Sequence, residues 1–364
     1  MKRIKGILLA GLCLAFTSVF AQTDAPKYSN EFLDIGVSAR ALSMGNSVVA
    51  SVNDVTSGYW NPAGLLGVTS NINISLMHAE YFAGIAAYDY AAVAAPIDSV
   101  SAFAITAIRF GVDNIPNTTQ LIDAEGNVNY DNITSFSAAD YAFIFSYARN
   151  FGIPGLSLGA SIKVIHCIVG TFANSWGFGF DLGGQYKYKG WQFGAEARDV
   201  TSTFNAWSYT LDQQTLAVFQ ETGNEIPENG IEVTLPRLLL GAGRNFSFFK
   251  NKISLFTELD ADVTFDGRRN TLISSNPISV DPHLGLEIGY KGLIFLRGGI
   301  GNIQQSSDPT GAGITTFQPD FGVGIKIKSF SLDYTLTDIG NTSVATYSNI
   351  FSLKLDINKK KRST

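Results

Sequence analysis

Residue types that could carry out catalysis are few and scattered in this sequence. The three histidines, His78, His166 and His283, stand in separate segments, with no serine or cysteine motif beside them and no Gly-x-Ser-x-Gly elbow. A lone histidine in a strand is usually a packed or rim residue. We therefore expect no catalytic residue and no enzymatic activity. The alternative, hydrolysis of a membrane lipid, would need a serine close to one of these histidines.

Carboxylates form two further patterns. Within 111–137, acidic and amide side chains alternate and offer the oxygen ligands that calcium prefers, without EF-hand spacing: Asp123, Glu125, Asn127, Asn129 and Asp131. We expect a solvated loop there, with no metal site and no cofactor. Glu258, Asp260 and Asp262 recur at every second position, so we expect basic residues to balance them, or else a selectivity lining for a polar solute. The candidate partners are Lys163, Arg198, Arg237, Lys326 and Lys354.

The first residues have the pattern of an export signal. Three basic residues precede an apolar run from 7 to 20, and Ala21 ends a site that signal peptidase accepts. We therefore expect residues 1–21 to be removed. Cys13 follows a large residue, which argues against a lipid anchor there. Cys167 then stands alone in a predicted strand and forms no internal disulfide.

Charge and composition exclude some partners. The formal charge of −5 becomes −8 when the three basic residues of the signal are lost, so nucleic acid is not expected as a partner. Charged residues make up only 16% of the chain, which has 36 Gly and 44 Phe, Trp and Tyr together. That composition suits a protein with lipid outside and a packed lumen inside.

Alternation of apolar and polar residues with period two predicts strands from residue 69 onward. No other segment approaches the ~20 apolar residues of a transmembrane helix, whereas each predicted strand is near the ~9–11 residues that a tilted membrane strand requires. We expect fourteen strands in an all-β, antiparallel transmembrane barrel, with a secreted sandwich as the alternative. Their spans are 69–79, 84–95, 99–110, 138–150, 155–167, 174–188, 190–200, 233–246, 251–265, 283–291, 292–301, 318–328, 329–338 and 346–357.

The connections between these strands alternate in length. Tight turns alternate with long loops at 111–137, 201–232, 266–282 and 302–317, which is the asymmetry between periplasmic turns and extracellular loops. We therefore assign residues 68–358 to the barrel in the outer membrane of a Gram-negative bacterium. The even strand number places both chain ends in the periplasm, including the basic tail 359–364.

The segment between the signal and the barrel, 22–67, carries a family resemblance. Ala39-Arg40-Ala41-Leu42-Ser43-Met44-Gly45 is followed by Asn61-Pro62-Ala63-Gly64-Leu65. This segment resembles the PorV/PorQ family of outer-membrane barrels, on its PorV side, and more distantly the FadL fatty-acid channels. The resemblance implies that the segment folds into the lumen as a hatch. We assign the hatch motif to Arg40, Met44, Gly45, Asp54, Trp60, Asn61, Pro62, Ala63 and Gly64.

The hatch motif itself predicts local structure. Pro62 fixes one backbone angle and Gly64 tolerates positive φ, so we expect a tight turn capped by the side chain of Asn61. For Arg40 and Asp54 we expect ion pairs with the wall. The hatch either seals the lumen or moves as a gate that contacts a ligand.

Two functions follow from the resemblance. A PorV-like barrel belongs to type IX secretion, binds the C-terminal signal domain of exported cargo and carries it from the translocon to the attachment complex. Its partners would be that cargo, other secretion components and outer-membrane lipid. The alternative is a FadL-like passive channel for hydrophobic small molecules. The channel function predicts an apolar pocket beside the hatch and a lateral opening where a strand kinks, at Pro236 or Gly298-Gly299. The secretion function instead predicts a filled lumen and long outer loops that bind a protein.

Overall fold

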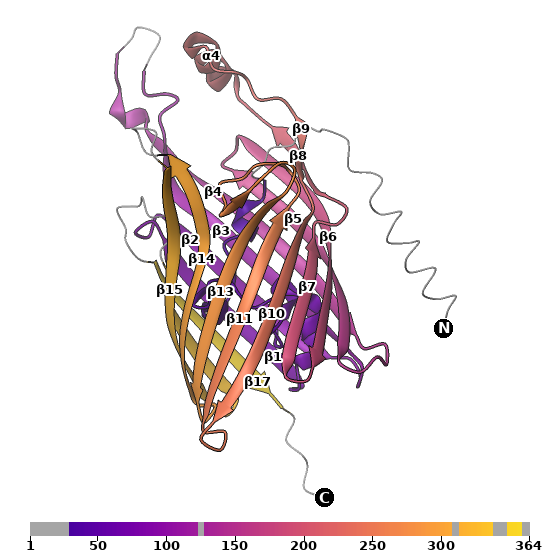
Figure 1. Ribbon diagram of the computed structural model, residues 1–364. Helices are drawn as coiled ribbons and strands as arrows, with labels where there is room; N and C mark the ends of the chain where they lie inside the picture. Colours follow the sequence, from indigo (N-terminus) through magenta and orange to yellow (C-terminus); the bar gives the residue numbers. More distant parts are fainter. Residues whose placement is uncertain (1–28, 123–126, 308–312, 338–347, 359–364) are drawn as a thin grey trace, which may run out of the picture.

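The computed structural model describes residues 29–122, 127–307, 313–337 and 348–358, and Figure 1 shows them as one tilted barrel. The predicted signal peptide 1–21, the residues up to 28 and the basic tail 359–364 lie outside this described part, as do Asp123 and Glu125 of the acidic loop. Every described strand belongs to a single sheet. The described chain is therefore one β-domain.

Fourteen strands close the barrel in the described part of the chain. They are β1 (Ile72–Tyr81), β2 (Ala86–Pro96), β3 (Ser101–Asn117), β4 (Thr134–Arg149), β5 (Leu156–Val169), β6 (Ala173–Tyr188), β7 (Trp191–Arg198), β10 (Arg237–Phe248), β11 (Ile253–Thr264), β13 (Ser279–Tyr290), β14 (Ile294–Ser307), β15 (Gly313–Ile327), β16 (Phe330–Thr337) and β17 (Ser348–Ile357). The first and last pair antiparallel, from Ile72 opposite Ile357 onward. The predicted fourteen-stranded antiparallel barrel is confirmed.

Several strands are longer than the alternation predicts. β3 has 17 residues and β4 has 16, more than the ~9–11 that cross the bilayer, so their ends project beyond it. Outside lipid the outer face need not be apolar, and the period-two signal fades there. For the same reason the segments predicted as loops contain further elements: β8 (Thr203–Tyr209), β12 (Ile273–Ser274), α4 (Gln213–Thr222) and η3 (Tyr130–Asn132). β9 (Gly230–Thr234) begins in a predicted loop, and its last two residues fall in the predicted strand 233–246.

Alternation along each strand separates two faces. In β6, Trp176, Phe178 and Phe180 are exposed on the outside, whereas Ser175 and Asp181 point inward and are buried. Closure leaves no sheet edge, which lipid could not solvate. Only tight turns lie at the end of the described barrel where β1 begins and β17 ends (Figure 1). The long loops and α4 lie at the other end, together with the short β1–β2 and β5–β6 turns. No described helix is long and apolar enough to cross a membrane.

Two neighbouring strands are interrupted at the same level. β7 pairs with β10 and β8 pairs with β9, but pairing stops between Arg198 and Thr203 on one side and between Thr234 and Arg237 on the other. Pro236 lies in this break, where its lack of an N–H removes a ladder donor. The second predicted kink is wrong, because β14 stays paired on both sides through the Gly298-Gly299 pair.

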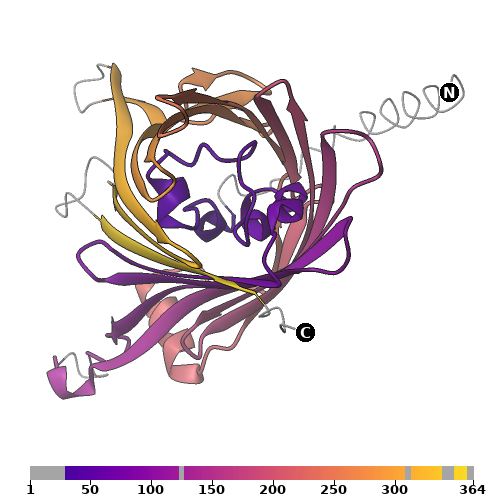
Figure 2. The same ribbon diagram turned by 90° about the horizontal axis from the view of Figure 1, so that it is seen from below.

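The segment before β1 lies inside the barrel. It consists of η1 (Glu31–Leu33), α2 (Ala39–Leu42), α3 (Ser57–Trp60) and η2 (Pro62–Gly67), joined by turns. Seen along the barrel, these pieces occupy the lumen (Figure 2). Their apolar side chains pack against small and aromatic residues of β1 to β5 and form the hydrophobic core. We call residues 29–67 the hatch from here on.

Candidate functional site

The Asn61-Pro62-Ala63-Gly64 motif turns the hatch against the wall. The Asn61 side chain accepts a hydrogen bond from the Ala63 amide at 3.2 Å and donates to the Gly184 carbonyl on β6 at 3.1 Å. Pro62 begins η2, the position where a missing N–H costs nothing. Gly64 does not adopt the positive φ that the motif predicts. Its lack of a Cβ instead admits the Val52 carbonyl oxygen.

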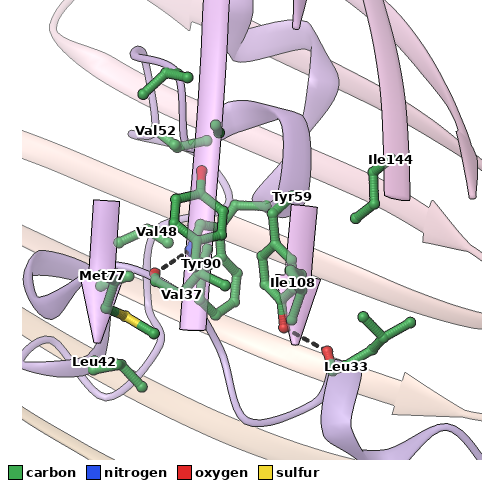
Figure 3. Packing of buried hydrophobic residues seen from close by; sticks show 14 of the residues in the cluster. Leu33, Val37, Leu42, Val48, Val52, Tyr59, Met77, Tyr90, Ile108 and Ile144 are labelled. Atoms are coloured by element: carbon green, nitrogen blue, oxygen red, sulfur yellow. Dashed lines mark hydrogen bonds between the residues drawn. The ribbon is translucent and has the colours of Figure 1, made fainter. Parts of the chain in front are cut away.

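Two aromatic residues fix the middle of the hatch, and Figure 3 shows one of them, Tyr59, among the buried hydrophobic residues. The Trp60 indole donates to the Val37 carbonyl at 2.9 Å, and the Tyr59 hydroxyl donates to the Leu33 carbonyl. Burial raises the pKa of Tyr59 to about 12, so this hydroxyl stays a donor. Arg198 of β7 donates to the Tyr59 carbonyl at 3.0 Å and lies over both rings. Arg198 therefore connects the hatch to the end of β7, beside the interruption.

The charged hatch residues pair with the wall. Arg40 contacts Glu287 at 3.0 Å, and Glu287 also accepts from Arg297 at 2.6 Å. Asp54 pairs with Lys354 of β17. Burial alone would raise the pKa of Asp54, but Lys354 and the hydrogen bonds from Thr56 outweigh burial and hold the pKa well below its usual range. Both pairs thus fix the hatch to strands from the C-terminal half of the barrel.

Replacing Asp54 with asparagine is expected to lower the free energy of unfolding by about 1–3 kcal/mol at pH 7, because Lys354 loses its charged acceptor. The pKa of Asp54 is lower in the folded state, so the pair stabilises at every pH above the unfolded value and loses this effect as the pH falls through the folded value. Urea unfolding at pH 7, 5 and 3 should therefore show that the free energies of unfolding of wild type and variant converge only below about pH 4. A difference independent of pH would contradict this role.

Wall glycines let the hatch backbone approach closely. A Cβ on Gly299 would overlap the backbone of Met44 and Gly45, and one on Gly159 would overlap that of Pro62 and Ala63. His283 also holds Gly45, donating through Nδ1 to its carbonyl at 2.9 Å. The Gly298-Gly299 pair thus makes room for the hatch at Gly299.

The three acids of β11 share the lumen face as predicted, but only one has a basic partner from the predicted set. Arg237 bonds Asp262 at 3.3 Å and also pairs with Asp34 of the hatch. Glu258 and Asp260 instead accept the amides of Ala50 and Val49, at 2.6 and 3.0 Å. Their assignment to wall cations is therefore wrong: the donors come from the hatch backbone, which no charge pattern in the sequence indicates.

The interruption in the wall is lined by charged groups and closed by the hatch. Lys163 lies 2.8 Å from Asp181 and 2.6 Å from Asp199, and all three side chains are less than a tenth exposed. The first described hatch residues bond the broken edge: Ser29 accepts from the Thr234 hydroxyl at 2.9 Å, and Asn30 donates to the same hydroxyl at 2.7 Å. A cavity of only ≈ 30 Å³ remains there.

The cavity beside the hatch differs from the predicted apolar pocket. It measures ≈ 400 Å³ and is bordered by Trp60 and Leu239, but also by Arg237, Asp262 and Asp281. Asp262 and Asp281 face each other across β11 and β13. The prediction of an apolar pocket at this place is wrong, because the charges that hold the hatch also line the space next to it.

An apolar cleft lies instead among the loops at the extracellular end. It measures ≈ 430 Å³ and is lined mainly by apolar side chains, among them Phe136, Phe172, Trp207 and Phe219. Phe136 and Phe172 meet edge to face with ring centroids 5.2 Å apart. Two other aromatic residues of these loops do not line this cleft: Tyr130 is exposed and Phe204 faces outward. Phe172, in the β5–β6 turn, was missed because a single residue there carries no pattern.

The histidines are not brought together. His78, His166 and His283 lie on β1, β5 and β13, which are not neighbours. His166 stacks on Trp176 at a centroid distance of 4.0 Å on the outer face. Among the residues described, no group of three or more metal-ligating side chains is gathered closely enough to hold an ion. The buried thiol of Cys167 is free.

Several solved structures share this architecture. The toluene transporter TbuX of Ralstonia pickettii is 13% identical, with 89% of this chain and 99% of its own covered and a TM-score of 0.53. A Pseudomonas aeruginosa FadL homologue is 12% identical, with 88% and 98% covered and a TM-score of 0.50. The chain has the FadL-like barrel fold. The monoaromatic hydrocarbon channel CymD, 12% identical with 89% and 98% covered, gives a TM-score of 0.55. No protein-family model and no curated protein matches the sequence.

The FadL-like fold accounts for the two faces of this barrel. Its outer face exposes large apolar side chains on strands all around the barrel, including Leu76, Phe178 and Val323. Such a surface requires lipid, and this fold is that of Gram-negative outer-membrane proteins. The predicted location in the outer membrane is confirmed. At these identities the comparison concerns fold alone and does not separate a PorV-like protein from a FadL-like one.

Proposed function

We propose that this FadL-like barrel is a passive channel that lets small hydrophobic molecules enter the outer membrane, without catalysing a reaction. The observation that carries the proposal is the paired interruption of β7/β8 and β9/β10, which breaks the wall at one level. A break in a membrane wall is costly unless its backbone groups are covered. Here the Asp199 amide donates to Asp181 and the Val200 amide to the Phe180 carbonyl, while Ser29 and Asn30 of the hatch bond the Thr234 hydroxyl at the edge of the break.

The apolar cleft supports the proposal from the extracellular side. Trp207 of β8 lines it, and its indole donates to Glu232 of β9 at 2.6 Å. The cleft therefore reaches β8, the short strand above the interruption, and Trp207 connects it to β9. A hydrophobic molecule held there would reach lipid through the break once the first hatch residues moved aside, without crossing the charged cavity in the lumen. The similar structures described as a toluene transporter and a monoaromatic hydrocarbon channel agree with such a substrate.

A disulfide across the interruption tests the channel. The hydroxyl oxygens of Ser29 and Thr234 lie 2.9 Å apart, so the pair Ser29→Cys/Thr234→Cys can lock the hatch to β9. In cells without other channels of this fold, oxidation should reduce uptake of labelled toluene and long-chain fatty acid to background, and a reductant should restore it. The matched control is Thr203→Cys/Thr234→Cys, which joins two residues already paired in register. Equal uptake by the locked and reduced forms would refute lateral passage.

One observation favours a second candidate function, that of a PorV-type carrier in type IX secretion. The hatch occupies most of the lumen and is bonded to strands around the barrel, among them β1, β4, β6, β7, β11 and β17. A filled lumen suits a barrel whose loops bind the C-terminal signal domain of cargo. A pulldown of the oxidised Ser29→Cys/Thr234→Cys variant from outer membranes distinguishes the two functions by what remains bound. Retention of cargo or attachment-complex subunits would support the carrier, and co-purification of fatty acid alone would support the channel.

A further inference from the structure

Charged side chains on the outer face gather at one place. Among the charged residues at outward-facing positions of the described strands, Arg149 and Arg244 lie near the strand ends that tight turns join. The other charged outward residues are contributed by three neighbouring strands. They are Glu80 on β1, Asp89 on β2, and Arg109 and Asp113 on β3, with His78 beside them. We call these five residues the outer charged row.

The outer charged row is bonded across the strands. His78, Asp89 and Arg109 stand opposite one another in register. His78 Nδ1 lies 2.7 Å from Asp89, and the Arg109 guanidinium lies 3.8 Å from Asp89 and 3.4 Å from Asp113. Half of the Asp89 side chain nevertheless remains exposed, at 48%. These groups would face lipid with open hydrogen-bonding capacity, which is costly at the bilayer centre and cheap only near its surface.

An apolar groove lies directly beneath the row. Two positions further along the strands, Leu76, Ala91, Ala107 and Phe143 stand side by side in register. The two alanines leave a groove of ≈ 530 Å³ between the larger side chains, and His78, Asp89 and Arg109 border it. The wall below continues with the apolar pair Ile74 and Val93. The groove therefore opens toward the membrane interior at one end and meets charges at the other.

Its position matches the boundary between acyl chains and headgroups. His78 stands three residues before the extracellular end of β1, and Asp89 three residues after the start of β2. At ~3.3 Å per residue this places the outer charged row within about 10 Å of the β1–β2 turn. A groove that is apolar below and charged at this level fits an amphiphile aligned with the lipids.

We propose that this groove binds one zwitterionic aminophospholipid, with an acyl chain over Ala91 and Ala107 and its headgroup on the outer charged row. Charge complementarity selects the headgroup. An ammonium donates to carboxylates, which Glu80, Asp89 and Asp113 supply, and a phosphate accepts from Arg109. A purely anionic headgroup would be repelled by the three carboxylates and attracted by only one guanidinium. A choline headgroup offers no N–H donor and would bind more weakly.

Native mass spectrometry of the purified full-length barrel tests this site, with phosphatidylethanolamine, phosphatidylglycerol and phosphatidylcholine of equal chain length as probes. We expect one bound phosphatidylethanolamine at concentrations where the other two do not bind. Ala107→Phe, which fills the groove, should abolish binding, and Asp89→Asn should remove the preference over phosphatidylcholine. Ala195→Phe, at an exposed outward position on β7, is the matched control and should bind as wild type. Heat-modifiable migration on gels confirms that each variant is folded.

Three results would overturn the proposal. One is equal binding of all three lipids, another is binding that survives Ala107→Phe in a folded variant, and the third is a preference for phosphatidylglycerol, which would mean that Arg109 alone sets the charge selection. Recovery of a protein bound at the groove in place of lipid would also overturn it. The result does not depend on whether the lumen serves transport or secretion, because the groove lies on the opposite side of the wall.

Discussion

Gly299→Val is expected to detach the hatch from the wall. A Cβ at this position would overlap backbone atoms of Met44 and Gly45, which cannot move aside as a flexible side chain would. Overpacking of this kind costs about 3 kcal/mol or more, and the hatch can relieve it only by leaving β14. We expect faster hydrogen exchange of hatch amides and a measurable ion conductance in planar bilayers, where wild type should show almost none.

Gly298→Val provides the matched control for this experiment. Gly298 is the preceding residue and faces outward, with only the Asp320 carbonyl oxygen within contact distance, at 3.9 Å. It should leave both hydrogen exchange and conductance unchanged. If both variants behave alike, the effect arises from strand propensity and not from contact with the hatch. If Gly299→Val stays closed, the hatch is held more loosely at Met44 than the structure indicates.

Lys163→Met should be the most destabilising of the charge changes. The Lys163 ammonium is only 4% exposed and lies between the carboxylates of Asp181 and Asp199. Removing it leaves two carboxylates buried without a counter-ion, which typically costs about 3–5 kcal/mol. Asp199 begins the break in the wall, so we also expect the strand ends around residues 199–202 to become mobile. Urea unfolding of the refolded barrel measures the first effect and hydrogen exchange the second.

A second variant separates loss of charge balance from loss of packing. The triple replacement Lys163→Met/Asp181→Leu/Asp199→Leu removes the charges together and should recover most of the stability, because uncharged side chains of similar size avoid the desolvation cost. Failure of the triple variant to recover would mean that hydrogen bonds of Asp199, such as that from Thr203, organise the break.

The strands were predictable because lipid imposes alternation on them. Each of the fourteen predicted spans overlaps one barrel strand, and the last strand, predicted at 346–357, is observed at 348–357. Where the wall leaves the bilayer this constraint ends, and the residues of β8 and the first three residues of β9 were accordingly predicted as loop. The break at Pro236 left a trace in the sequence because proline lacks a donor, whereas its counterpart near Asp199 left none.

Contacts between the hatch and the wall were much less predictable. Asn61 and Pro62 indicate a turn by their own chemistry, but the partners of Glu258 and Asp260 are backbone amides some 208 and 211 positions away. Backbone amides carry no sequence signature. The outer charged row was also hidden, since His78, Asp89 and Arg109 become neighbours only through the register of three strands.

The ion pair of Asp54 with Lys354, which joins residues 300 positions apart, bears on the order in which the molecule is assembled. The hatch is made before any strand of the barrel, yet it bonds β17, the strand that pairs with β1 to complete the circle. Contacts of such long range form late in folding, since the intervening chain must first be ordered. We therefore expect closure of the β1–β17 seam and capture of the hatch to occur together, in the last step of folding.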